Sequence, residues 1–170
     1  FYEVYNLDYL EINLPNLPTL QSIEGMVLSV KEQQSITLKI KAFDTSNATN
    51  IKTAFYNPNI VDSNFVKKLD TSKVKNMSSA FAMKNCGTLD LRSVDISSVV
   101  SGSIYEGIGY MFNWLTAPID IYLGDLLSRS DLSYYSGYVF VGSRNEGIKL
   151  LTANSIKMSV NFKSCPNLLE

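Results

Sequence analysis

The stretch FDTSNATNIKTAF (43–55) is followed 26 residues later by a near copy, LDTSKVKNMSSAF (69–81). Six of the thirteen aligned positions are identical. These are Asp44/Asp70, Thr45/Thr71, Ser46/Ser72, Asn50/Asn76, Ala54/Ala80 and Phe55/Phe81. A phrase that returns after about 20–50 residues predicts a repeat architecture, in which neighbouring units stack and form the core between them.

The second half of the phrase is an apolar residue, three variable residues and Phe. It recurs in weaker form at IGYMF (108–112), SGYVF (136–140) and MSVNF (158–162). Runs such as TLDLRSV and PIDIYLG follow the Phe residues, and their alternation of apolar positions is typical of strands. Asp, Thr and Ser are helix N-cap residues, and Asp suits the positive end of the helix dipole. Each unit is therefore expected to form a short strand, a turn at Asp-Thr-Ser and a short helix that ends near Phe.

The repeated phrase resembles the BspA-type leucine-rich repeats of bacterial surface proteins. LDTSKVKNMSSAFAMKNCGTLDLRSVDISSV (69–99) carries the resemblance most strongly, and NFKSCPNLL (161–169) restores its Cys-containing part. The resemblance implies an α/β repeat fold, a leucine-rich-repeat-like solenoid with a short strand, a turn and a short helix per unit. It implies about four to five irregular units over residues 43–170.

Residues 1–42 match no such pattern, and we expect them to form an N-terminal β-rich cap on the array. Within this segment, SIEGMVLSV (22–30) and SITLKIKAF (35–43) are two apolar-rich runs that KEQQ separates, which predicts a β-hairpin. An alternative is a separate interaction module that uses Tyr2, Tyr5 and Tyr9.

Matching letters of the repeats should become neighbours in the core. We expect one ladder of phenylalanines, a second ladder of other apolar residues, and a facing wall from the strands. In that order, the sets are Phe55, Phe81, Phe112, Phe140 and Phe162; Ile51, Met77, Ile108 and Met158; and Leu89, Leu91, Ile119, Ile121, Ile148 and Leu150.

The two cysteines, Cys86 and Cys165, occupy the same position in units three apart. Strands stack about 4.8 Å apart, so positions three units apart are separated by roughly 14 Å, whereas a disulfide tolerates a Cα separation of only about 7 Å. Both are therefore expected to be free, buried thiols.

Composition argues against several classes of function. The chain of 170 residues has no His, which removes the commonest general base and many nucleophile and metal sites. The net charge is −1 without a basic run, so a nucleic-acid partner has no electrostatic support. No apolar run is long enough for a membrane helix in this segment. We predict a non-catalytic chain without metal or cofactor.

Side chains that alternate along the strands should form a candidate binding face on the outside of the sheet. They are Lys39, Lys41, Asp90, Arg92, Asp120, Tyr122 and Lys149. Tyrosines near Gly and Ser are candidate loop contacts, as in adaptable recognition loops. They are Tyr105, Tyr110, Tyr134 and Tyr135. The alternatives are a merely solvated sheet face and tyrosines that only cover the core.

The resemblance implies a surface-exposed recognition or adhesion module that binds a protein or glycan on a host or neighbouring cell. The expected location is extracellular or at the cell surface, as a fragment of a longer protein. Self-association through the open end of the solenoid is possible in this interpretation. Two rival hypotheses are a structural or host-recognition component of a bacteriophage virion, and a structural spacer in a larger surface protein.

Overall fold

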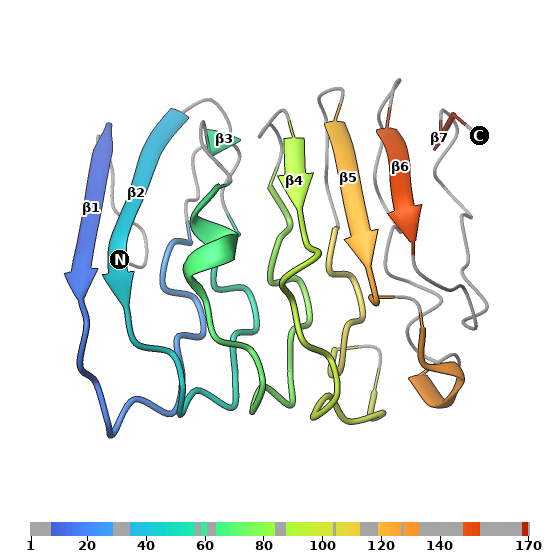
Figure 1. The fold of residues 1–170 in the computed structure, drawn as a ribbon, viewed down its shortest axis with the longest axis horizontal. Coiled ribbons are helices and arrows are strands. Elements are labelled where there is room, and N and C mark those ends of the chain that lie inside the picture. Colours follow the sequence, from blue (N-terminus) through green and yellow to red (C-terminus); the bar gives the residue numbers. More distant parts are fainter. Residues whose placement is uncertain are drawn as a thin grey trace.

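Parallel strands lie side by side in chain order along the molecule (Figure 1). The structure is a computed structural model, and it describes residues 8–28, 35–56, 59–60, 64–83, 88–103, 105–112, 119–126, 128–132, 148–153 and 168–169. Strands β1 (Tyr9–Leu14), β2 (Ser35–Phe43) and β3 (Asn59–Ile60) form one sheet. Strands β4 (Thr88–Asp90), β5 (Ile119–Gly124), β6 (Ile148–Ala153) and β7 (Leu168–Leu169) form the other. Each strand pairs in parallel with its neighbour.

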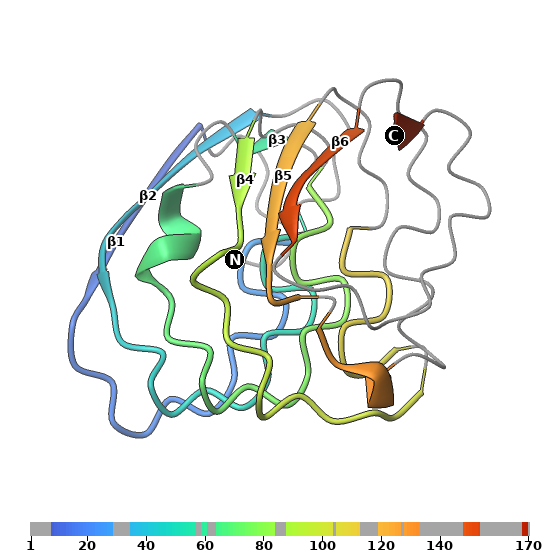
Figure 2. The same cartoon turned by 45° about the vertical axis from the view of Figure 1, so that its right-hand side comes forward.

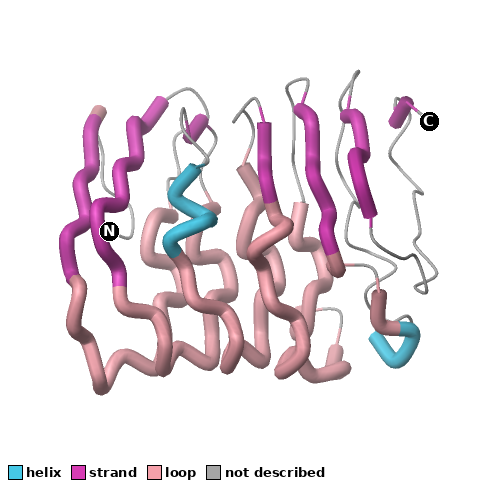
Figure 3. Tube along the Cα trace, viewed as in Figure 1, coloured by secondary structure: helices cyan, strands magenta, loops and turns pink. Residues whose placement is uncertain are grey.

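Helix is almost absent from the described part of the chain (Figure 3). It consists of two 3-10 helices, η1 (Asn64–Lys68) and η2 (Ser130–Leu132). The prediction of an α/β repeat, a leucine-rich-repeat-like solenoid with a short helix in each unit, is therefore wrong. The described residues form two small parallel sheets joined by turns and loops.

The helices are absent because the segments that were expected to be helical donate alternate N–H groups to a neighbouring segment. The N–H groups of Ile51, Thr53 and Phe55 donate to the carbonyls of Asn76, Ser78 and Ala80 at 2.9, 2.9 and 3.1 Å. An N–H that is used in this way cannot close a bond to the carbonyl four residues earlier, which an α-helix requires.

The same bonds recur through four stacked segments, residues 22–27, 50–55, 76–81 and 107–112. Ile23, Ile51 and Met77 donate their N–H groups to the carbonyls of Asn50, Asn76 and Gly107 at 3.0, 2.9 and 2.6 Å. Figure 2 shows these segments behind the layer of strands. The first of them lies inside the segment predicted as a cap and was missed in the sequence, because Val27 stands where the later segments have Phe.

The same position in each stacked segment has a left-handed backbone, and Gly107 adds a second left-handed residue to the last segment. Gly25, Thr53, Ser79 and Tyr110 have φ values of 64°, 51°, 54° and 55°. Only Gly adopts this conformation without steric cost, and a β-branched residue such as Thr is strained there. The stacking of the segments therefore imposes the left-handed backbone at this position, whichever side chain the position carries.

The expected hairpin in residues 22–43 is also wrong. Residues 24–27 form a turn, and Ser22 forms a parallel bridge with Asn50. Strand β2 pairs in parallel with β1, in the register Leu10↔Leu38 and Ile12↔Ile40. Its other edge pairs in parallel with β3.

The predicted core is confirmed where the structure describes it. Phe55, Phe81 and Phe112 are fully buried, and the rings of Phe55 and Phe81 stack with centroids 6.1 Å apart. The other confirmed members are Ile51, Met77, Ile108, Leu89, Leu91 and Ile121. Phe140, Phe162, Met158, Cys86, Cys165 and the side chains of Ile119, Ile148 and Leu150 lie outside the described residues.

The Asp-Thr-Ser phrase links successive layers instead of capping helices. The buried hydroxyl of Thr71 donates to the carbonyl of Asp95 at 3.1 Å and accepts from the N–H of Asp95 at 2.8 Å. Thr45 makes the same two bonds with Asp70, at 2.9 and 2.8 Å. Each threonine therefore ties the start of its turn to the next turn along the molecule.

The Asp of the phrase closes its own turn. Asp70 accepts bonds from the N–H and the hydroxyl of Ser72 at 3.0 and 2.7 Å, and Asp44 does the same with Ser46. The serine hydroxyl bond is the main cause that lowers the pKa of each of these carboxyl groups. This is the geometry of an Asx-turn, which competes with helix formation.

Replacing Thr71 by Val tests the link between layers. Thr71→Val keeps the shape of the side chain but leaves both backbone groups of Asp95 without this partner. We expect the free energy of unfolding, measured by urea denaturation, to fall by about 1–3 kcal/mol. The matched control, Ser72→Ala, removes an exposed hydroxyl and should cost about 0.5 kcal/mol or less. Equal losses in the two variants would contradict the role of Thr71.

Candidate functional site

The outward face of β1 and β2 carries a group of four polar side chains, Tyr9, Glu11, Lys39 and Lys41, which we name the Glu11 cluster. Glu11 pairs with Lys41 at 2.6 Å and with Lys39 at 3.7 Å, and the Tyr9 hydroxyl donates to it at 2.7 Å. The hydrogen bond from Lys41, and then that from Tyr9, lower the pKa of Glu11. The bond to Glu11 raises the pKa of Lys41 in turn.

A second group lies on η1, β4, the turn after β4, and β5. It consists of Lys67, Asp90, Arg92 and Tyr122, and we name it the Asp90 cluster. Arg92 donates to both oxygens of Asp90, through Nε at 2.8 Å and Nη2 at 2.7 Å. Lys67 reaches the same carboxylate from η1 at 3.1 Å. The Arg92 guanidinium carbon lies 4.8 Å from the centroid of the Tyr122 ring, within cation–π range.

Hydrogen bonding fixes the charge state of this cluster. The bonds from Arg92 to Asp90 are the main cause that holds the pKa of this carboxyl far below its ordinary value, and Lys67 adds to the effect. The same bonds raise the pKa of Arg92. Bidentate pairing also fixes the plane of the guanidinium group, so that its face lies against Tyr122.

Gly124, at the end of β5, allows the chain to pass close to Arg92. Its φ is 55°, and a Cβ at this position would lie 2.9 Å from the Arg92 Cα. Any other residue would push β5 away from the turn after β4. The short contact explains why glycine stands at the residue that follows the buried Leu123.

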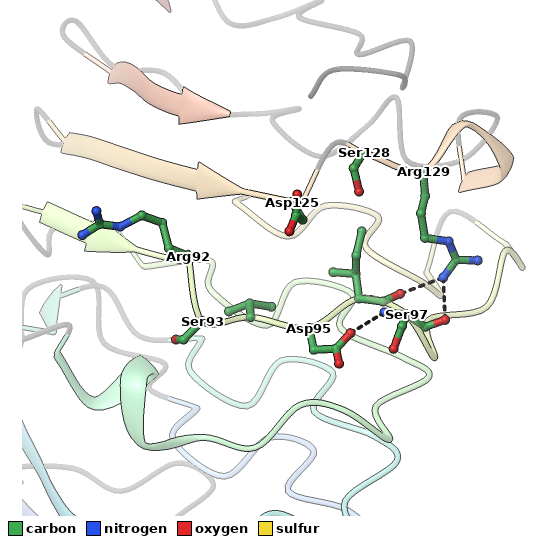
Figure 4. A pocket seen from close by; sticks show the side chains of 9 residues that line it. Arg92, Ser93, Asp95, Ser97, Asp125, Ser128 and Arg129 are labelled. Atoms are coloured by element: carbon green, nitrogen blue, oxygen red, sulfur yellow. Dashed lines mark hydrogen bonds between the residues drawn. The ribbon is translucent and has the colours of Figure 1, made fainter. Parts of the chain in front are cut away.

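An open cavity of about 500 Å³ lies next to Arg92, between the turn after β4 and the turn after β5. The two walls carry Arg92, Ser93, Asp95 and Ser97, and then Asp125, Ser128 and Arg129 (Figure 4). This volume lies within the range of about 300–1,000 Å³ that is usual for small-ligand sites. Val94 and Ile96 complete the lining, so the cavity combines hydroxyl, carboxylate and guanidinium groups with apolar side chains.

The cavity lies where the threonine links end. Ile96 stands at the position that Thr45 and Thr71 occupy in the earlier turns, and it has no hydroxyl to bond to the next turn. Instead, Arg129 reaches across, and its Nη1 donates to the carbonyls of Ile96, Ser97 and Val99 at 2.7, 3.1 and 2.8 Å. Asp131 holds the same guanidinium group in place from the other side.

Two of the predicted loop contacts lie together. The rings of Tyr105 and Tyr110 stack with centroids 5.8 Å apart, and Tyr105 is exposed. Tyr134 and Tyr135 lie outside the described residues.

The predicted binding face is split between the two sheets. Asp90, Arg92 and Tyr122 come together as expected, whereas Lys39 and Lys41 belong to the Glu11 cluster, on the far side of η1 (Figure 1). Asp120 lies between Thr88 and Lys149 in the register of β4, β5 and β6. The side chain of Lys149 is outside the described part of the chain.

Sequence reasoning missed Glu11, Lys67 and Arg129. Glu11 lies in a segment that matches no repeat, and nothing in the sequence places η1 in the strand layer. The alternation of YLEINL (9–14) was the signal that could have placed Glu11 on the outward face.

Within the residues that the structure describes, no three His, Cys, Asp or Glu side chains lie together in a way that could hold a metal ion. The same residues include no helix long and apolar enough to cross a membrane.

Comparison with known proteins identifies a family. Residues 21–114, more than half of the chain, match the family described as "Mycoplasma protein of unknown function, DUF285". The chain belongs to this family. The DUF285 match includes both copies of the repeated phrase and the stacked segments from residue 22 onward. No curated protein and no solved structure matches the chain.

The low pKa of Asp90 predicts how stability depends on pH. Because the folded-state pKa lies below the unfolded value of about 3.9, the ion pairs of Asp90 contribute fully above that value and are lost as the pH falls toward the folded pKa. Asp90→Asn should therefore flatten part of the decline in unfolding free energy between about pH 5 and pH 2. Urea denaturation at a series of pH values measures both curves. Parallel curves for the wild type and the variant would contradict this assignment.

Proposed function

We propose that this chain is a non-catalytic recognition and adhesion module of a surface-exposed protein, which binds a protein or glycan on a host or neighbouring cell. The observation that carries the proposal is the Asp90 cluster beside the open cavity. An exposed guanidinium group, held over a tyrosine ring, lies next to a hollow lined by both polar and apolar side chains.

The chemistry of the Asp90 cluster suits recognition. Arg and Tyr are the residue types that contribute most often to binding energy at interfaces, because they combine a large apolar area with hydrogen-bond donors. Arg92 is oriented by Asp90 before a ligand arrives, so less conformational entropy is lost on binding.

The strands beneath the cluster provide a rigid support. Leu89 and Leu91 alternate with the outward residues of the β4 region and are fully buried, as is Ile121 of β5. Sites on rigid elements hold their geometry better than sites on loops.

The residues of the cavity support binding better than catalysis. Its lining has carboxylates and hydroxyls but no His, since the chain contains none. Asp95 accepts a bond from the N–H of Ser97 at 2.7 Å and so closes its own turn.

The surface location rests on the sequence. The phrase LDTSKVKNMSSAF (69–81) resembles repeats of BspA-type bacterial surface proteins. The proposal therefore places the chain outside the cell, as part of a longer protein.

A binding comparison tests the proposal. The wild-type chain is applied to an array of neutral and charged glycans and to a panel of purified extracellular matrix proteins. Arg92→Ala with Tyr122→Ala should weaken binding to the recognised ligand by about tenfold or more. The matched control is Lys75→Ala, an exposed cation in the turn between Thr71 and Met77.

Circular dichroism and thermal melting would establish that each variant is folded. Lys149→Ala is measured in the same series. Equal binding by the wild type and by every variant would support the spacer hypothesis and overturn the recognition site. A wild-type chain that binds none of the glycans and none of the matrix proteins would also overturn the proposal.

A further inference from the structure

The Glu11 cluster and the Asp90 cluster have the same composition. Each combines one carboxylate with two cations and one tyrosine. In the first, Tyr9 donates to the carboxylate, and in the second, Tyr122 lies against the Arg92 guanidinium group. The recurrence on two different sheets points to a shared role.

Both clusters lie on one outward face of the molecule. Leu10 and Ile12 of β1, Leu38 and Ile40 of β2, and Leu89 of β4 point to the opposite side and belong to one hydrophobic core. Helix η1 lies between β2 and β4 and contacts both strands (Figure 1). Its buried Phe65 and Val66 join the same core, whereas Lys67 and Lys68 point to solvent.

The two clusters are positive even though the chain as a whole is not. The two clusters contain four cations and two carboxylates, a net charge of +2, while the whole chain carries −1. The side chains of the four cations are between 50% and 58% exposed, whereas those of Glu11 and Asp90 are 30% and 14% exposed. A ligand that approaches the face therefore meets cations first, and the carboxylates lie beneath them.

We propose that an anionic polysaccharide binds across this face, from the Glu11 cluster over η1 to the Asp90 cluster. Sulfate or carboxylate groups of the sugar chain accept bonds from Lys39, Lys41, Lys67 and Arg92. This inference rests on the proposed function, because it names the chemical class of the ligand.

The tyrosines favour a polysaccharide over an acidic peptide. Each pair of cations has a tyrosine ring beside it, and Tyr9 is half exposed. The half-exposed Tyr9 ring, whose hydroxyl is bonded to Glu11, offers an amphipathic surface that suits the mixed apolar and polar surface of a sugar ring, whereas the Arg92 guanidinium group lies over the Tyr122 ring. One cation–tyrosine site lies on each side of η1, and this arrangement fits an extended chain with repeated charges.

Binding to immobilised polysaccharides tests the proposal. The probes are heparin, which carries sulfate and carboxylate groups, hyaluronan, which carries carboxylates alone, neutral dextran, and polyglutamate as an acidic peptide. Binding to heparin alone would assign the site to sulfate, and binding to hyaluronan as well would show that carboxylates suffice. Equal binding to dextran or to polyglutamate would overturn the proposal.

Charge variants locate the site. Lys39→Gln with Lys41→Gln, and separately Lys67→Gln with Arg92→Gln, should each weaken heparin binding roughly tenfold, as expected for the loss of two exposed ion pairs. The matched control is Lys73→Gln with Lys75→Gln, two exposed cations outside the strand layer. Equal losses in the control pair would indicate nonspecific attraction and overturn the site.

Two further measurements separate an electrostatic from a purely structural role. Glu11→Gln should bind heparin more tightly, because Lys39 and Lys41 are then no longer neutralised, and a loss like that of the lysine pair would overturn the proposal. Raising the salt from about 0.1 M to about 1 M shortens the Debye length from about 10 Å to about 3 Å and should abolish binding.

The outcomes for the two proposals are distinguishable. If anionic polysaccharides do not bind while another surface ligand still depends on Arg92 and Tyr122, the inference fails and the proposed function stands. If no surface ligand binds at all, both fail.

Discussion

The backbone hydrogen bonds between stacked segments are the constraint on which the rest of the structure depends. Alternate N–H groups of residues 50–55 donate to the carbonyls of residues 76–81, and those of 76–81 donate to residues 107–112. This pattern brings Phe55 onto Phe81 in the interior and repeats a left-handed residue in every segment. The strands on the opposite side are parallel and follow the chain order within each of the two sheets.

The threonine links show how a small change in the sequence alters the surface. Thr45 and Thr71 bind both backbone groups of the Asp in the next turn. Ile96 fills the same buried position with an apolar side chain, so the link stops there, and Arg129 satisfies the carbonyls of that turn instead. The open cavity beside Arg92 lies at this interruption of the regular pattern. A departure from the repeat thus coincides with the open cavity that borders the Asp90 cluster.

The candidate site could be predicted only in part. Asp90, Arg92 and Tyr122 were recognisable because strand alternation places them opposite the buried Leu89, Leu91 and Ile121. Lys67 could not be assigned, since its role depends on η1, which follows the short strand β3 and lies between β2 and β4. Glu11 lies in a strand whose pairing with Lys39 depends on a parallel register that no local pattern specifies. The charge of the face likewise depends on which side chains meet, and the net charge of the chain conceals it.

The sequence by itself determined the repetition, the family and the identity of many of the buried residues, because apolar periodicity is a local property that burial must satisfy. The tertiary structure decided what the Asp-Thr-Ser phrase does. The same side chains can cap a helix or close a turn, and the choice depends on whether the following N–H groups bond within the segment or to the next one. In this chain the neighbouring segment supplies the carbonyls, so the expected helices gave way to turns and parallel strands. The two clusters of charge and tyrosine exist only because that stacking brings residues from separate turns together.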